Sequence, residues 1–154
     1  MPILYVLIGL PGSGKSYWAR EYADRISAVV IGSDDVRNEF QTRGQNPQAG
    51  DAVFAEVERR TRAHLQANLS VVLDATHSLR KYRSYATHLA RELNVACVAI
   101  WFDVPVEEAL RRNRWRTGNR FGDQSIPDKA ISNIADHFEP PTTAEFDRVV
   151  RIEG

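Results

Sequence analysis

The stretch GLPGSGKSYWARE, residues 9–21, directly follows an apolar run, ILYVLI, at residues 3–8. Its spacing, Gly-x4-Gly-Lys-Ser, satisfies the full Walker A pattern, with a strand-like run before it and a helix-like stretch after it. Glycines allow backbone turns that other residues rarely adopt, and they let amide groups approach phosphate oxygens. The start of the helix adds a positive partial charge at the same place. This stretch therefore predicts a strand, a phosphate-binding loop and a helix.

Such a loop is expected to bind a nucleoside triphosphate, ATP with Mg²⁺ in the simplest case. Lys15 should bridge the β- and γ-phosphates, and the Ser16 hydroxyl should ligate Mg²⁺. Tyr17 stands where Thr is common, so a contact with the α-phosphate is either lost or made by the phenol. Packing on an amphipathic helix is the alternative for Tyr17, and it is favoured for Trp18. The loop residues expected to bind the donor are Gly9, Pro11, Gly12, Ser13, Gly14, Lys15, Ser16 and Tyr17.

The composition is that of an ordinary globular protein and sets limits on the possible partners. The 154 residues, 43% of them hydrophobic and 26% charged, fit a single domain spanning 1–154. Because the formal net charge is zero, a polyanion would have to meet a local basic patch. Cys97 is expected to be a buried small hydrophobic residue, and no Cys/His cluster indicates zinc. No run approaches membrane-spanning length, so a cytoplasmic protein is expected.

Apolar, β-branched runs recur along the chain, and helix-like stretches fill the intervals between them. Runs of this kind are typical of strands buried on both faces of a parallel sheet. The alternation predicts a three-layer α/β fold with a central parallel sheet of about five strands. Strands are expected at 3–8, 28–31, 71–73, 95–102 and 148–152, and helices at 16–26, 35–41, 51–69, 79–93, 106–115 and 126–138.

Two segments, 42–51 and 116–125, mix glycine with polar residues. Both are expected to be mobile and able to close over a ligand. The second, taken as about 116–126, is the expected lid.

The stretch VVIGSDDVR, residues 29–37, ends a predicted strand and places two carboxylates at the carboxyl edge of the sheet. Phosphoryl transfer to an alcohol needs a carboxylate that orients and deprotonates the hydroxyl. Asp34 is the candidate, with capping of the next helix as its alternative. Arg37 lies three residues further on the same helical face, where it could hold an acceptor-side phosphate.

Two further stretches carry charged candidates. VVLDATH, residues 71–77, resembles a Walker B strand, and Asp74 at its end could reach the Mg²⁺ shell or position Lys15. In ALRRNRWRTGNR, residues 109–120, Arg112 and Arg116 are spaced i, i+4 and so share one helical face before the glycine-containing segment. They could reach the transferring phosphate, and a solvated basic surface is the alternative.

The motifs IGLPGSGKSYWARE, SDDVR, VVLDATH, FDVP and RRNRWR occur in the order and spacing of the bacteriophage polynucleotide kinase 5′-kinase domain. The chain also resembles the kinase modules of bacterial RNA end-repair enzymes. The resemblance to these P-loop polynucleotide 5′-hydroxyl kinases runs from Ile3 to about Ile152. It implies a P-loop kinase fold with a lid, and transfer of the ATP γ-phosphate to the 5′-hydroxyl end of DNA or RNA.

The resemblance also implies roles for individual residues. It makes Asp34 the general base and Arg37 a ligand of a substrate phosphate next to the acceptor. It places Arg112 and Arg116 on the donor phosphates, with Arg116 among the catalytic residues beside Lys15. Asp74 matches the acidic residue of the family's Asp-Ala-Thr-Asn segment.

Some features depart from the family pattern. His77 stands where Asn is usual, and we expect it either to alter the grip on donor or acceptor or to lie on the surface. The lid is longer than in the phage enzyme. No phosphatase or ligase domain follows Gly154, so any end-repair partner is expected to be a separate protein.

Relatives with the same motifs phosphorylate other alcohols: gluconate, nucleoside, antibiotic and seryl-tRNA kinases, and the zeta-toxin group. Asp34 and Arg37 favour the polynucleotide branch, whereas the zero net charge does not. A kinase of small molecules and a non-enzymatic ATP-binding switch therefore stay open as alternatives.

Overall fold

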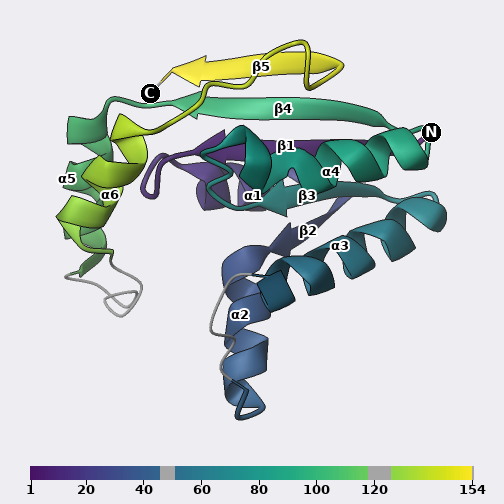
Figure 1. Ribbon diagram of the computed structural model, residues 1–154, viewed down its shortest axis with the longest axis horizontal. Helices are drawn as coiled ribbons and strands as arrows, with labels where there is room; N and C mark the ends of the chain where they lie inside the picture. The colour runs from purple at the N-terminus through teal and green to yellow at the C-terminus, as the bar shows by residue number, and fades with distance from the viewer. Residues whose placement is uncertain (46–50, 118–125, 154) are drawn as a thin grey trace.

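The computed structural model describes residues 1–45, 51–117 and 126–153, with side chains throughout except at 115–117. Within these ranges five strands alternate with six helices (Figure 1). The strands are β1 Ile3–Gly9, β2 Ala28–Gly32, β3 Ser70–Asp74, β4 Ala96–Asp103 and β5 Arg148–Glu153. The helices are α1 Lys15–Tyr22, α2 Ser33–Thr42, α3 Asp51–Gln66, α4 Arg80–Glu92, α5 Val106–Thr117 and α6 Asp128–Asp136.

The strands form one sheet in the order β2-β3-β1-β4-β5, and each neighbouring pair is parallel. Because parallel neighbours need crossover connections, helices must cover both faces of such a sheet. The predicted three-layer α/β fold with a parallel sheet of five strands is thus confirmed.

The central strand β1 contributes to two cores, one on each face of the sheet. Leu4, Val6 and Ile8 pack with residues of α3 and α4, whereas Leu7 packs with Ala19 of α1 and with Ala23, which follows that helix. This division follows from the period of two along a strand. Burial on both faces explains the continuous apolar run that precedes the phosphate loop.

The last strand departs from the expected pattern. None of the residues of β5 is fully buried: three are half-buried and three are exposed. This strand is not among those buried on both faces, because β5 lies at the edge of the sheet and pairs only with β4.

Three helices lie around the carboxyl ends of the strands. At one end of the sheet α5 and α6 pack on Leu10, the residue that follows β1, through Ala109 and Ile131. Helix α2 follows β2 and projects away from the sheet, apart from α5 and α6 (Figure 1). None of the described helices is long and apolar enough to cross a membrane.

Candidate active site

The loop that joins β1 to α1, residues 10–14, takes its shape from two glycines. Gly12 has φ +84° and Gly14 has φ +103°, both left-handed conformations that other residues rarely adopt. A Cβ atom on Gly12 would also lie 2.7 Å from the carbonyl oxygen of Ala109 in α5. Position 12 therefore needs glycine both for its turn and for its close packing against α5.

Lys15 begins α1 and turns its ammonium group back onto the loop. It is buried, and Nζ donates hydrogen bonds to the carbonyl oxygens of Gly9 at 2.8 Å and Leu10 at 2.9 Å. No side chain caps the N-terminus of α1. Its first amide groups lack intrahelical partners, so they and the helix dipole form a site suited to an anion. A bound triphosphate would compete with the two carbonyls for the Lys15 ammonium.

Ser16 links the phosphate loop to the end of β3. Its hydroxyl donates a hydrogen bond to Oδ2 of Asp74 at 2.8 Å. Burial raises the pKa of Asp74, the Ser16 hydrogen bond and Lys15 oppose this, and the negative charges of Asp34 and Asp35 raise the pKa further. The carboxylates of α2 and β3 therefore share one electrostatic environment.

The residues at this point fit a magnesium ion. A hydroxyl beside a carboxylate is an oxygen donor set that Mg²⁺ uses together with phosphate oxygens and water. In the described part of the chain, no group of three or more His, Cys, Asp or Glu residues could hold a metal by itself. A Mg²⁺ ion held by Ser16 and Asp74 would therefore take its other ligands from the nucleotide and from water.

Asp34 lies in the first turn of α2, and its carboxylate is exposed. The helix begins at Ser33 after Gly32, and no side chain caps it, so Asp34 does not act as the cap. The neighbouring Asp35 differs, because its Oδ2 lies 3.0 Å from where a Cβ on Gly32 would stand. Within the described residues Asp34 has no hydrogen bond or ion pair, which leaves its oxygens available to a ligand.

Arg37 lies one helical turn beyond Asp34 and is half-buried. Its guanidinium group likewise has no ion pair or hydrogen bond in the part of the chain that the structure describes. A carboxylate and a guanidinium thus lie close together along α2, and neither neutralises the other.

Arg112 is the described member of the predicted arginine pair. Its Nη1 atom lies 3.7 Å from where a Cβ on Gly14 would stand, so the guanidinium group adjoins the phosphate loop. Its Nε donates to Glu108 at 3.1 Å. The pKa of Glu108 is lowered to about 2, chiefly by a hydrogen bond from Arg111 and also by Arg112. The basic run is therefore partly ion-paired on its own helix, while Arg112 still adjoins the loop.

Several predictions fall on residues that the structure does not describe. The side chain of Arg116 is one of them, as are residues 118–125 of the expected lid and 46–50 of the other expected mobile segment. Both ends of the lid segment meet at Asn113, which the sequence analysis did not single out. Its Nδ2 donates to the carbonyl of Ile126 at 2.5 Å, and its Oδ1 accepts from the Ile126 amide at 3.2 Å.

The two aromatic residues after Ser16 behave differently. Trp18 packs inward, with its ring centroid 6.3 Å from that of Phe102 and 5.5 Å from that of Tyr22. Tyr17 is 63% exposed at the start of α1. The packing alternative is therefore confirmed for Trp18 and wrong for Tyr17.

His77 is buried, so the expectation of a surface position is wrong, and an effect on the grip on donor or acceptor stays a prediction. Its Nδ1 lies 2.7 Å from the carbonyl oxygen of Leu7 in β1, and its Nε2 lies 2.8 Å from the Tyr85 hydroxyl. Burial is the main cause that lowers the pKa of His77 to about 4. The neutral ring therefore donates from Nδ1 to the carbonyl and accepts at Nε2 from the hydroxyl.

Arg83 is buried like His77, but the sequence analysis did not identify it. Its Nε and Nη2 donate to the Glu145 carboxylate at 2.8 and 2.9 Å. Its other hydrogen bonds reach the carbonyls of His77 at 3.0 Å, Glu139 at 2.8 Å and Pro140 at 3.3 Å. Burial would raise the pKa of Glu145, but the hydrogen bonds from Arg83 leave it lowered. Arg83 thus ties the segment after β3 to the chain that follows α6.

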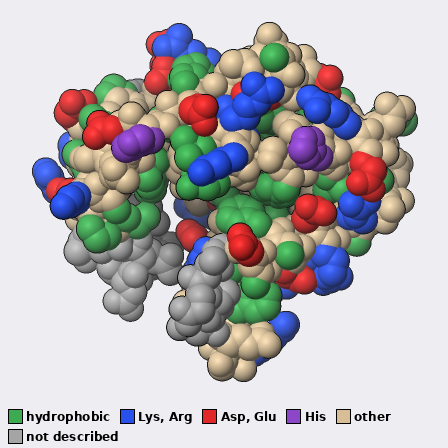
Figure 2. Space-filling model, viewed as in Figure 1, with side chains coloured by type: hydrophobic (Ala, Val, Ile, Leu, Met, Phe, Trp, Pro, Cys, Tyr) green, Lys and Arg blue, Asp and Glu red, His purple; other side chains and the backbone are tan. Residues whose placement is uncertain are grey.

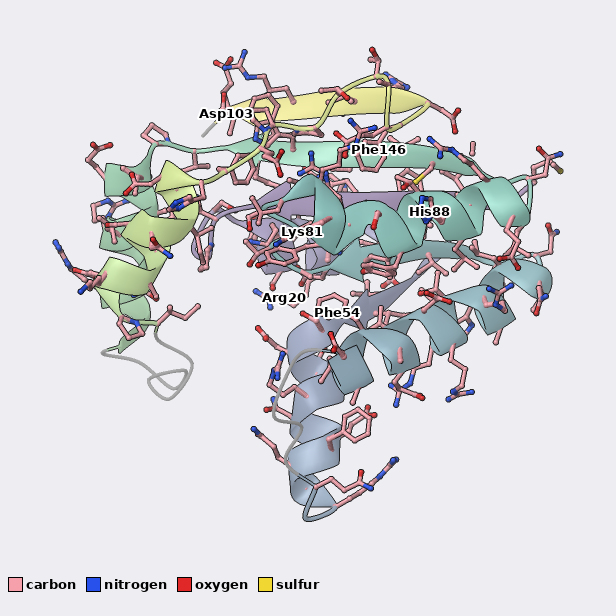
Figure 3. All side chains as sticks on the ribbon, viewed as in Figure 1. Arg20, Phe54, Lys81, His88, Asp103 and Phe146 are labelled. Carbon is pink, nitrogen blue, oxygen red and sulfur yellow. The ribbon has the colours of Figure 1, made fainter. Side chains whose placement is uncertain are left out.

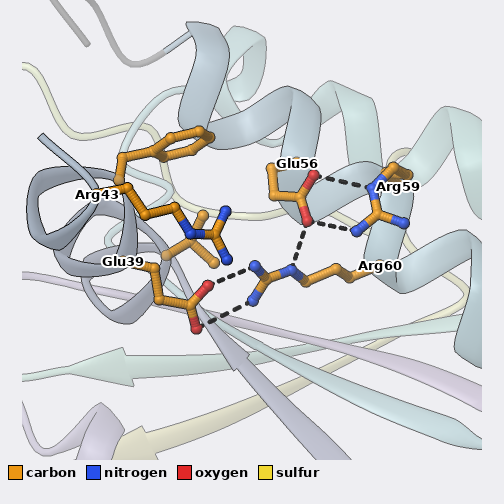
Figure 4. A pocket seen from close by; sticks show the side chains of 7 residues that line it. Glu39, Arg43, Glu56, Arg59 and Arg60 are labelled. Atoms are coloured by element: carbon orange, nitrogen blue, oxygen red, sulfur yellow. Dashed lines mark hydrogen bonds and ion pairs between the residues drawn. The ribbon is translucent and has the colours of Figure 1, made fainter. Parts of the chain in front are cut away.

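Two concavities lie away from these residues. One of about 190 Å³ lies between α2 and α3, where Glu39 and Glu56 pair with arginines (Figure 4). One of about 170 Å³ lies between the end of β4 and helices α5 and α6. Neither is lined by Lys15 or Asp74, so chemistry rather than enclosed volume marks the candidate site. In the view of Figure 1, the surface of the molecule has a hollow in which basic and acidic side chains are visible (Figure 2).

Comparison with known proteins places this site in a family context. The family model described as AAA domain matches residues 4–141. L-seryl-tRNA(Sec) kinase of Methanococcus maripaludis is 25% identical over 146 residues, which are 92% of this chain and 54% of that protein. Shikimate kinase of Corynebacterium glutamicum is 30% identical over 141 residues, 90% of this chain and 75% of that protein.

A solved structure extends the comparison to RNA repair. A chain of the Pnkp1/Rnl/Hen1 RNA repair complex matches with a TM-score of 0.73 and 28% identity, over 88% of this chain and 43% of its own length. The present chain therefore spans about half the length of the seryl-tRNA kinase and less than half of the RNA repair chain.

Proposed function

Since this chain belongs to the AAA domain family, we propose that it transfers the γ-phosphate of ATP to the 5′-hydroxyl end of a polynucleotide. The family and two kinase relatives support a kinase-type phosphotransferase with a phosphate loop, and the acceptor is the finer part of the proposal. One observation carries the acceptor assignment: an exposed carboxylate, Asp34, and a guanidinium, Arg37, lie one turn apart on α2 with no described ion pair.

On the donor side, the loop amides and Lys15 would hold the β- and γ-phosphates of ATP. Ser16 and Asp74 would hold Mg²⁺, which neutralises charge on the phosphate oxygens when it is bound. Arg112, beside Gly14, and Arg116 would stabilise the negative charge of the transferring group. Lys15 would turn from the carbonyls of Gly9 and Leu10 to phosphate oxygens.

On the acceptor side, Asp34 accepts the proton of the 5′-hydroxyl while that oxygen forms a bond to the γ-phosphorus. The bond between this phosphorus and the oxygen that bridges it to the β-phosphate breaks, and ADP leaves with the electron pair. Arg37 binds the phosphate that follows the reacting nucleotide, which fixes the strand end opposite the donor.

The exposure of Asp34 among the described residues and the similarity to an RNA repair chain support a polymer acceptor. A strand end can reach a group that faces solvent, whereas a small alcohol is usually held in an enclosed pocket. The RNA repair chain, at 28% identity, acts in a complex concerned with RNA.

A small-molecule acceptor is the second candidate, and two observations favour it. The net charge is zero, and the 30% identity is to a shikimate kinase. A panel with γ-labelled ATP separates the two. We expect label on 5′-hydroxyl DNA or RNA oligomers, with 5′-phosphorylated oligomers as the unreactive control. Label found only on shikimate, gluconate, a nucleoside or seryl-tRNA would refute the polynucleotide proposal.

The role of Asp34 is tested by Asp34→Asn, which preserves size and removes the base. We expect kcat to fall by roughly 10²–10⁴ while ATP affinity is kept. Asp35→Asn is the matched control, because that neighbouring carboxylate folds back on Gly32 and should lose much less. Equal losses in both variants would contradict the role of Asp34 as the base, and a functional readout that survives Asp34→Asn would favour the ATP-binding switch instead.

A further inference from the structure

The two sides of β1 are paired over different lengths. On one side the pairing with β4 continues to Gly9 opposite Phe102. On the other side the pairing with β3 ends at Val6 opposite Leu73, three residues before the phosphate loop begins. Alternate residues of a strand direct their backbone groups to the same side, so Leu7 and Gly9 share the side that β3 has left. Buried backbone groups there need other hydrogen-bond partners.

The segment after β3 supplies these partners. The amide of Gly9 donates to the carbonyl of Thr76 at 3.1 Å. The carbonyl of Leu7 is 2.7 Å from Nδ1 of His77, and the same imidazole reaches the Tyr85 hydroxyl in α4 through Nε2 at 2.8 Å. The His77 side chain thus supplies the hydrogen bond that β3 does not give to Leu7, and it connects the end of β1 to α4.

We propose that His77 is a positioning residue, which holds the end of β1 so that the phosphate loop starts from a fixed place. The loop carbonyls that bind Lys15 belong to Gly9 and Leu10, two and three residues beyond the carbonyl that His77 holds. A shift of β1 at Leu7 would therefore be passed directly to the group that grips the nucleotide. This inference takes the proposed phosphotransfer as its setting and adds a residue that does not touch the substrate.

The backbone of His77 is itself held in place. Its φ is +49°, in the left-handed region where His, Asn and Asp are enriched among residues other than glycine. Its carbonyl accepts a hydrogen bond from the buried Arg83 at 3.0 Å. Asn would tolerate this backbone. Its side chain is too short, however, for one amide group to replace the two ring nitrogens that bridge Leu7 and Tyr85.

Packing around the imidazole is separable from its hydrogen bonds. Phe54, near the N-terminal end of α3 (Figure 3), has its ring centroid 6.3 Å from that of His77 and 5.4 Å from that of Tyr85. Phe54 makes no side-chain hydrogen bond, so Phe54→Leu removes aromatic contact and leaves the bridge intact. It is the matched control for a role that is only structural.

The test compares His77→Asn, Tyr85→Phe and Phe54→Leu in KM for ATP, KM for the acceptor, and melting temperature. For His77→Asn we expect the KM for ATP to rise about fivefold, as for loss of one uncharged hydrogen bond, with the acceptor KM unchanged. Tyr85→Phe should move the KM for ATP in the same direction by less. Phe54→Leu should lower the melting temperature and leave the KM for ATP where it was.

An unchanged KM for ATP in both His77→Asn and Tyr85→Phe would overturn the proposal. So would equal increases in Phe54→Leu at a matched loss of melting temperature. If His77→Asn does not fold, Tyr85→Phe decides the question, because it keeps the imidazole and removes its second partner. If the wild-type protein phosphorylates no acceptor, the proposed function fails, and the same ranking of ATP affinities by calorimetric titration still tests His77.

Discussion

The phosphate loop and the start of α2 form the two halves of the candidate site, and their side chains are held in different ways. Behind the loop, His77 and Arg83 are buried and bonded to backbone and side-chain groups. On α2, Asp34 is exposed and Arg37 half-buried, and within the described ranges neither has an ion pair. The side chains behind the loop are held by other groups of the protein, whereas Asp34 and Arg37 have no ion pair among the described residues.

The contrast is clearest between two arginines. Arg83 is 1% exposed, and all of its guanidinium donors reach acceptors, because a buried charge is stable only when it is paired and hydrogen-bonded. Arg37 keeps contact with water and can remain without a partner. We infer that the protein fixes in advance the geometry that the triphosphate needs, and leaves on α2 the charges that recognise the acceptor.

The largest effect on stability is expected when Arg83, one of the two buried residues behind the phosphate loop, is replaced. Arg83→Met removes the partner of Glu145 and should lower the free energy of unfolding by about 3–5 kcal/mol. The reason is that a buried carboxylate is left without its cation and three carbonyls lose a donor. Denaturant unfolding measures this change. Adding Glu145→Gln should restore part of it, and a loss below about 1 kcal/mol in Arg83→Met would contradict the bracing role.

Local sequence patterns predicted most of the fold but only part of the site. The apolar runs and the Gly-Lys-Ser spacing are local signals, each only a few residues long, so the five strands and the phosphate loop could be predicted. The braces join distant residues: His77 and Leu7 are 70 positions apart, and Arg83 and Glu145 are 62 apart. No local period marks such a pair, so His77 was expected either to alter the grip on donor or acceptor or to lie on the surface, and Arg83 was not identified.

A smaller loss of stability is expected at acid pH, because His77 is buried in its neutral form. The pKa of His77 is lowered to about 4 by burial, with the charges of Lys15 and Arg83 adding to the effect. In the unfolded chain the pKa returns to its ordinary value of about 6.5, so the unfolded state takes up a proton first as the pH falls. The free energy of unfolding should therefore be full above pH 6.5 and fall by about 2 kcal/mol between pH 7 and pH 5.

The matched control for this prediction is His77→Asn, which has no titratable group at the position and should lose much less over the same pH range. Glu145 does not interfere. Its pKa is lowered in the folded protein, so its contribution is lost only as the pH falls below the ordinary carboxylate range. Equal slopes for wild type and His77→Asn between pH 7 and pH 5 would show that the imidazole is not held neutral by the fold.

The smallest effect compares Arg37 with an arginine that is already paired. Arg37→Ala should raise the KM for a 5′-hydroxyl oligomer about tenfold, because a hydrogen bond to a charged group is lost. It should also make the logarithm of affinity fall less steeply with salt, by about one phosphate contact. Arg59 on α3 has its Nη2 2.6 Å from a Glu56 oxygen and is 68% exposed (Figure 4), and such surface pairs contribute little.

Arg59→Ala should therefore change the oligomer KM by less than about twofold and leave the salt slope as it is. Both variants remove one positive charge, so a general electrostatic attraction would weaken binding equally in the two. Equal effects would mean that the arginines act only as a solvated basic surface. A tenfold difference would mean instead that what matters is where the charge lies, next to the Asp34 carboxylate, and that the unpaired half of the site reads the strand.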